Sequence, residues 1–102
     1  MPARTSTPLK QAFQRFVELV KPIEDVRHVM VLEDGRLDFF TYVTKLDEEI
    51  SMLVHEAEFE VMREFPDLPI LFHVRCLEGR PFDTQNLPAL SYSKGRARTG
   101  GL

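Results

Sequence analysis

The sequence has no tryptophan, a single cysteine and no long apolar run. One cysteine, Cys76, excludes an internal disulfide and is typical of proteins in a reducing cytoplasm. No stretch approaches the roughly 18 apolar residues that cross a bilayer, and the N-terminal residues contain no apolar signal core. We therefore expect a cytoplasmic protein with no membrane partner.

Sequence motifs for catalysis and for metal binding are also missing. No Gly-rich loop opens a helix, no G-x-S-x-G segment occurs, and no pair of Cys or His stands at metal-ligand spacing. His55 and Glu56 begin like the helix motif of zinc proteases, but the second histidine would stand where the chain has Phe59. The sequence predicts no catalytic residue, no metal site and no cofactor, and it does not specify a reaction.

The charges are unevenly distributed along the chain. Residues 1–77 contain 9 Lys and Arg against 14 Asp and Glu, whereas residues 78–102 contain 4 against 2. An acidic body repels the phosphate backbone of nucleic acids and offers no general attraction to anionic lipids. Nucleic acid is therefore a disfavoured partner.

Length and composition indicate one small globular domain. With 102 residues, of which 43% are hydrophobic and 28% charged, the chain can bury only a modest core, and oligomerisation is a natural supplement. We divide it into a loose N-terminal arm (1–6), a single α/β domain (7–77) and an extended, partly disordered basic tail (78–102).

Two segments show the 3.6-residue period of amphipathic helices. The first runs from Thr7, a candidate N-cap followed by Pro8, to Lys21. The second begins at Asp47 and ends at Phe65, because Pro66 disfavours helical geometry in the residue before it. Its expected core stripe consists of Leu46, Ile50, Leu53, Val54, Ala57, Val61 and Phe65.

Three segments have the composition of strands. Residues 26–32 and 37–43 flank Asp34-Gly35, which predicts a hairpin with a two-residue type I′ turn. That turn pairs Met30 with Phe39 on the face expected to meet the helices, and Val29 with Phe40 on the other face. Residues 70–77 alternate, with Ile70, Phe72, Val74 and Cys76 on the expected core face.

The predicted fold is a small two-layer α+β sandwich of order α-β-β-α-β. The hairpin and the crossover strand form a three-stranded mixed sheet, both helices cover one of its faces, and a flexible C-terminal tail follows. The sequence does not decide whether the third strand lies beside the first or the second.

Three groups of residues are candidates for interaction. The outer sheet face should combine aromatic and basic side chains, namely Arg27, Phe40, Tyr42, His73 and Arg75, together with Leu71. The second helix presents Met52, His55, Phe59 and Met62 away from its core stripe. The tail contributes Lys94, Arg96 and Arg98.

These groups support three hypotheses. The leading one is a non-enzymatic domain that acts by protein association, as a homodimer or as an accessory or regulatory partner, because the apolar surface exceeds what so small a chain can bury. The alternative is weak nucleic-acid binding through the basic tail and the aromatic and basic sheet face. The third is a small enzyme that uses His28, His55 or His73 with carboxylates.

Overall fold

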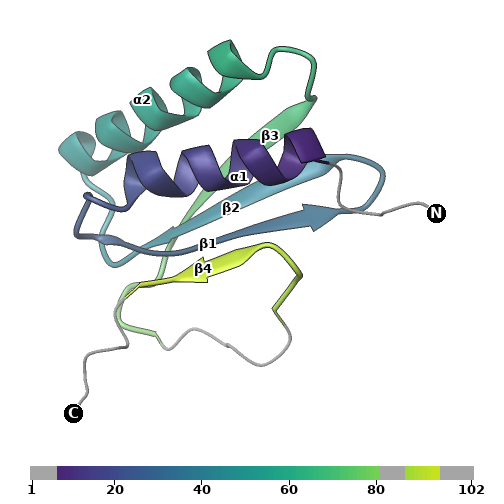
Figure 1. Ribbon diagram of the computed structural model, residues 1–102. Helices are drawn as coiled ribbons and strands as arrows, with labels where there is room; N and C mark the ends of the chain where they lie inside the picture. The colour runs from purple at the N-terminus through teal and green to yellow at the C-terminus, as the bar shows by residue number, and fades with distance from the viewer. Residues whose placement is uncertain (1–6, 81–86, 95–102) are drawn as a thin grey trace.

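Two helices cover one face of a four-stranded mixed sheet (Figure 1). The structure is a computed structural model that describes residues 7–80 and 87–94. The α-β-β-α-β order of the prediction is confirmed, and a fourth strand is added to it. The elements are α1 (Thr7–Val20), β1 (Val26–Glu33), β2 (Leu37–Val43), α2 (Glu48–Glu64), β3 (Ile70–Cys76) and β4 (Ser91–Ser93).

Both ends of α2 are set by the residues that the sequence indicates. The carboxylate of Asp47 accepts a hydrogen bond from the Ile50 amide at 2.9 Å, which caps the helix and lowers the pKa of Asp47. The helix stops at Phe65, directly before Pro66. The expected core stripe is only partly correct, because Leu46 and Leu53 are exposed.

The connection between β1 and β2 differs from the predicted two-residue turn. Glu33 pairs with Leu37, so three residues, 34–36, form the loop. A type I′ turn requires positive φ at both central residues, and in the described loop only Gly35 has it, at 79°. The chain forms a three-residue loop instead, which needs only one residue in the left-handed region, and Gly35 supplies it.

The longer loop shifts the hairpin register by one residue and turns β1 over. Val29 and Val31 are buried under the helices beside Phe39 and Thr41. The expected core placement of His28, Met30 and Leu32 is therefore wrong, and these residues share the outer face with Asp38, Phe40 and Tyr42. A register shift between Val26 and His28 returns Val26 to the core.

The sheet order is β3-β2-β1-β4, which settles the position of the third strand. β3 runs parallel to β2 in a regular register from Leu37 with Ile70 to Val43 with Cys76. β4 pairs antiparallel with β1, opposite His28 to Met30. This short strand comes from the segment predicted as tail, and it makes the sheet four-stranded where we expected three strands.

Three phenylalanines join the two layers. The rings of Phe16 on α1, Phe39 on β2 and Phe72 on β3 lie 5.3 to 5.9 Å apart between centroids. Phe16 and Phe39 are fully buried, and such aromatic contacts add to the free energy of burial. This cluster fixes the height of α1 above the sheet. Among the helices that the structure describes, none has the length and apolarity required to cross a bilayer.

Candidate protein interface

The outer edge of β3 is an open row of backbone hydrogen-bonding groups. The Leu77 amide donates to the Val43 carbonyl at 2.8 Å, so odd-numbered residues of this segment direct their backbone groups toward β2. Along a strand, the backbone N–H and C=O groups of successive residues point alternately to one neighbouring strand and to the other side. The N–H and C=O groups of Phe72 and Val74 therefore face away from the sheet.

β3 lacks the usual features that keep a sheet edge from pairing. Between Ile70 and Cys76 the sequence ILFHVRC contains no proline, no lysine and no acidic residue. Its pairing with β2 shows no bulge. Natural edge strands are commonly short, bulged, or protected by lysine or proline. This seven-residue edge is therefore suited to pair with another strand.

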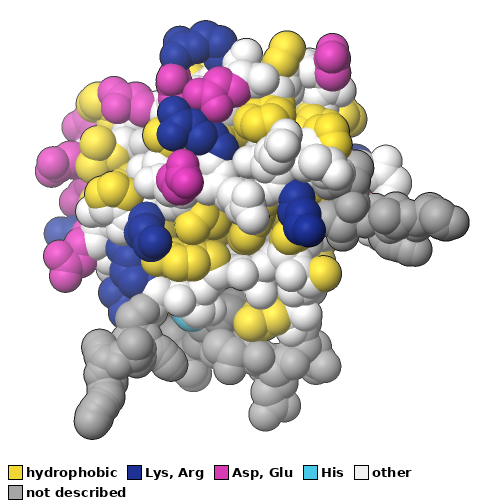
Figure 2. All heavy atoms as spheres, in the orientation of Figure 1, with side chains coloured by type: hydrophobic (Ala, Val, Ile, Leu, Met, Phe, Trp, Pro, Cys, Tyr) yellow, Lys and Arg dark blue, Asp and Glu magenta, His cyan; other side chains and the backbone are white. Residues whose placement is uncertain are grey.

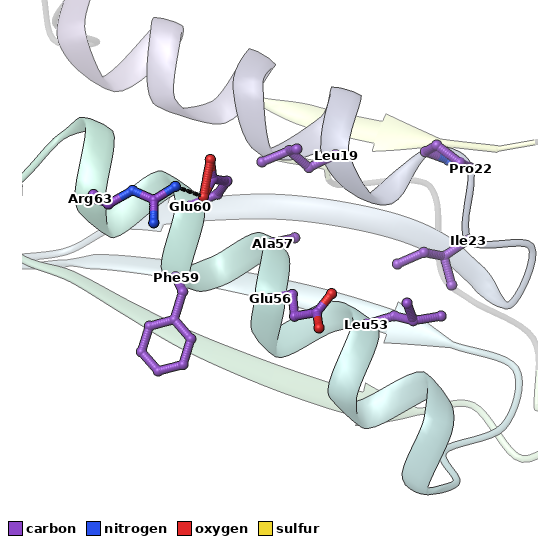
Figure 3. A pocket seen from close by; sticks show the side chains of 9 residues that line it. All are labelled: Leu19, Pro22, Ile23, Leu53, Glu56, Ala57, Phe59, Glu60 and Arg63. Atoms are coloured by element: carbon purple, nitrogen blue, oxygen red, sulfur yellow. Dashed lines mark hydrogen bonds and ion pairs between the residues drawn. The ribbon is translucent and has the colours of Figure 1, made fainter.

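The side of α2 that faces away from α1 is apolar and exposed. We call Met52, His55, Phe59 and Met62 the α2 patch. Met52 is 55% exposed, Phe59 66% and Met62 40%. In Figure 3 the ring of Phe59 points away from α1. In Figure 2 acidic side chains gather where α2 lies in Figure 1, with hydrophobic side chains between them.

A histidine–glutamate pair lies beside the α2 patch. His55 Nδ1 and Glu58 Oε1 are hydrogen-bonded at 3.0 Å, and Glu58 is buried whereas His55 is exposed. Burial raises the pKa of Glu58 above its usual range, and the hydrogen bond with His55 opposes that rise.

The outer sheet face contains a second pair, His73 with Asp38. His73 Nε2 lies 2.8 Å from Asp38 Oδ1, and Arg36 Nε donates to Asp38 Oδ2 at 3.2 Å. Phe40 stacks on the His73 ring with centroids 4.6 Å apart, and the Arg75 guanidinium lies 5.4 Å from the Phe40 centroid. The hydrogen bond from His73, and then that from Arg36, hold the pKa of Asp38 below its usual range.

These pairs bear on the enzymatic hypothesis. A carboxylate that fixes one imidazole nitrogen leaves the other able to exchange a proton, which is the geometry of a general base. Neither His73 nor His55 lines either of the two cavities described below. Within residues 7–80 and 87–94, no group of three or more His, Cys, Asp or Glu side chains is placed to hold a metal ion.

The residues of the nucleic-acid hypothesis are only partly brought together. Phe40 with His73 and Tyr42 with Arg75 are register neighbours on the outer face. Arg27 lies at the irregularity of β1, where its Nη2 donates to the Lys94 carbonyl at 3.4 Å. The Lys94 ammonium donates to the Ile23 carbonyl, and Arg96 and Arg98 lie outside the described residues.

Phe40 already packs against two side chains of its own sheet, His73 and Arg75. Stacking a nucleic-acid base on the Phe40 ring would therefore require displacing one of them.

His28 follows a different pattern from the other two histidines. Its Nδ1 is 2.9 Å from the Ser93 hydroxyl of β4, a contact across neighbouring strands of the sheet. The pairing of the two strands explains this contact without a chemical role.

A groove separates the two helices (Figure 3). It has a volume of about 580 Å³ and combines an apolar floor with charged groups. We call it the interhelix groove; it is lined by Leu19, Pro22, Ile23, Leu53, Glu56, Ala57, Phe59, Glu60 and Arg63. A smaller cavity of about 300 Å³ lies between α1 and β4.

Sequence reasoning missed the two histidine–carboxylate pairs and the groove. His55 and Glu58 stand three residues apart on a helix, a spacing that brings side chains together, so this pair could have been found. The pair of His73 with Asp38 depends on the parallel register of β2 and β3, which the sequence left open. The groove depends on how α1 and α2 pack.

Comparisons of the chain with protein-family models, with curated proteins and with solved structures find no match.

Proposed function

We propose that the protein acts by association with a second copy of itself, through the open edge of β3 and the α2 patch. The observation that carries this proposal is the coincidence of the two features at one side of the molecule. Backbone groups of Phe72 and Val74 face outward there. Phe59 of α2 is exposed, and its ring points away from α1, toward the β3 side of the sheet (Figure 3).

The backbone favours one arrangement of the two copies. A two-fold axis makes the two β3 strands antiparallel, and only even-numbered residues direct their hydrogen-bonding groups outward. Full overlap of Ile70–Cys76 then pairs Phe72 with Val74 of the second copy, and Val74 with its Phe72. His73 meets His73 of the second copy at the axis, as a pair without direct backbone hydrogen bonds.

The side chains suit this register. On the helix face it brings Phe72 beside a valine and Ile70 beside Cys76, so the paired groups are apolar or weakly polar. On the outer face Arg75 stands opposite Leu71, which avoids a contact between like charges. A partner copy also presents the same α2 patch, so the exposed Phe59 and Met62 find apolar groups to pack against. The result is a continuous eight-stranded sheet.

The test is the solution mass of Phe59→Asp measured by light scattering over a dilution series. The wild-type chain should be a dimer at micromolar concentration. An aspartate at position 59 places an unpaired carboxylate in the apolar contact, and it should weaken the dimer by more than about 100-fold.

The matched control is Leu32→Asp, since Leu32 is also exposed, at 41%, but lies on β1 and away from the open edge. This variant should retain the wild-type mass. A wild-type chain that is monomeric throughout, or a folded Phe59→Asp variant with an undiminished dimer, would refute the proposal.

A further inference from the structure

The interhelix groove has an apolar floor with acidic groups along one side. Leu53 and Ala57 of α2 face Leu19 of α1 across the floor (Figure 3). Glu56 and Glu60 stand one helical turn apart on the α2 side. Glu60 is paired with Arg63, whereas the Glu56 carboxylate has no hydrogen-bond or ion-pair partner among the described residues. The groove is thus suited to a segment that is both basic and apolar.

The described chain ends next to this groove. The Lys94 ammonium donates a hydrogen bond of 2.6 Å to the carbonyl of Ile23, which is itself a lining residue. The Lys94 amide donates to the Arg27 carbonyl at 2.8 Å, which continues the pairing of β4 with β1. Lys94, the last described residue, is therefore held beside the α1–β1 turn that forms one end of the groove.

The sequence that follows Lys94 is GRARTGGL, which contains Arg96, Arg98 and Leu102. Eight residues reach at most about 27 Å, and the groove residues from Leu53 to Arg63 span only about 15 Å of helix. In an extended segment Arg96 and Arg98 would lie on one side about 6.6 Å apart. Glu56 and Glu60 are separated by about 6 Å along the axis of α2, so the two spacings agree.

We propose that residues 95–102 occupy the interhelix groove of their own chain. Arg96 and Arg98 pair with Glu56 and Glu60, and the apolar floor receives the methylene stems of the arginines and the side chain of Leu102. This gives the basic end of an otherwise acidic chain a specific acceptor. The groove lies on the α1 side of α2, so its occupation leaves the β3 edge free, and of the α2 patch it involves only Phe59.

The experiment uses the full chain with a nitroxide spin label at position 99, introduced as Thr99→Cys in a Cys76→Ser background. Amide signals are compared before and after reduction of the label. Those of Leu53, Glu56 and Ala57 should lose most of their intensity while the label is active, and those of Phe40 and Tyr42 should keep theirs. Raising the salt concentration should restore part of the lost signal intensity, because salt screens the ion pairs between the arginines and the two glutamates.

The control variant carries the same label together with Arg96→Glu and Arg98→Glu, which repel the two glutamates and should restore the groove signals. The proposal would be overturned if the loss of amide signal intensity were greatest on the outer sheet face, or if the charge reversal left the loss at the groove unchanged. A loss seen when labelled chains are mixed with isotope-enriched unlabelled ones would also overturn it, since it would arise between copies. These outcomes are independent of the solution mass, so failure here is distinct from failure of the dimer proposal.

Discussion

The two edges of the sheet are built in opposite ways. β3 has seven residues, a regular parallel register and a single charged side chain, Arg75. β4 has three residues, and its pairing with β1 is continued on both sides by the bonds of Leu90 to Val31 and of Lys94 to Arg27. A three-residue edge strand offers too few backbone hydrogen bonds to pair stably with another strand. A seven-residue edge strand is long enough to do so.

The difference indicates which edge is available for a partner. At β4, hydrogen bonds within the chain secure the strand, including those of Ser93 with His28 and of Lys94 with Ile23. At β3, the sequence ILFHVRC contains no proline, lysine or acidic residue beside the outward backbone groups, and the exposed ring of Phe59 points toward that side of the sheet (Figure 3). We therefore expect changes at β3 to alter association and changes at β4 to alter stability.

The largest effect is expected for His73→Cys in a Cys76→Ser background. A two-fold axis at residue 73 brings the two Cα atoms to about 4.5 Å, the spacing of such a pair in antiparallel sheets, at which a disulfide can form. Mild oxidation should convert nearly all of this variant to a covalent dimer on a non-reducing gel.

The native chain is the control for this experiment. Cys76 would lie opposite Ile70 of the second copy, so the two native thiols would be about 20 Å apart and should not cross-link. Efficient cross-linking of native Cys76, or none at position 73, would show that the strands pair in another register or not at all.

A moderate effect is expected at the other edge, for Lys94→Met. The variant keeps most of the apolar stem but leaves the Ile23 carbonyl without its donor, and it should lower the free energy of unfolding by about 1 kcal/mol. Urea denaturation measures the loss, and light scattering should show an unchanged mass. If Lys94→Met were found to be monomeric, the two edges would not have separate roles in stability and association.

The smallest effect is expected for Asp38→Asn, next to β3 but on the outer face. Because the folded pKa of Asp38 is lowered, its ionised form stabilises the fold above the unfolded pKa, and this contribution is lost as the pH falls through the folded pKa. The variant should be less stable than the wild type at neutral pH, and the difference should vanish in acid. The matched control is Asp34→Asn, which removes the same charge from the exposed loop, and both variants are measured by urea denaturation.

Much of the fold follows from local signals in the sequence. The apolar period of α1, the Asp47 cap and Pro66 at the end of α2, and the alternation of Ile70 to Cys76 were sufficient to predict three elements and their order. These signals work because capping, proline geometry and side-chain alternation act over a few residues. The exposed Met52, Phe59 and Met62 of the candidate site were found for the same reason.

The remaining features depend on contacts that are distant in sequence or on small differences between turns. One residue more in the loop around Gly35 exchanged the faces of β1. β4 was missed because Ser91–Ser93 is too short to show a period, although Leu90 and Tyr92 alternate with the serines. The pairing of His73 with Asp38 requires knowledge of which strand lies beside β3.

The position of β4 also bears on how the chain folds. Ser93 meets His28 across 65 residues of sequence, so the partner of the outer edge of β1 is synthesised long after β1 itself. The hairpin, both helices and β3 can assemble before it, since their pairings are nearer in the sequence. We expect β4 to dock last, and until then β1 exposes backbone groups to other nascent chains.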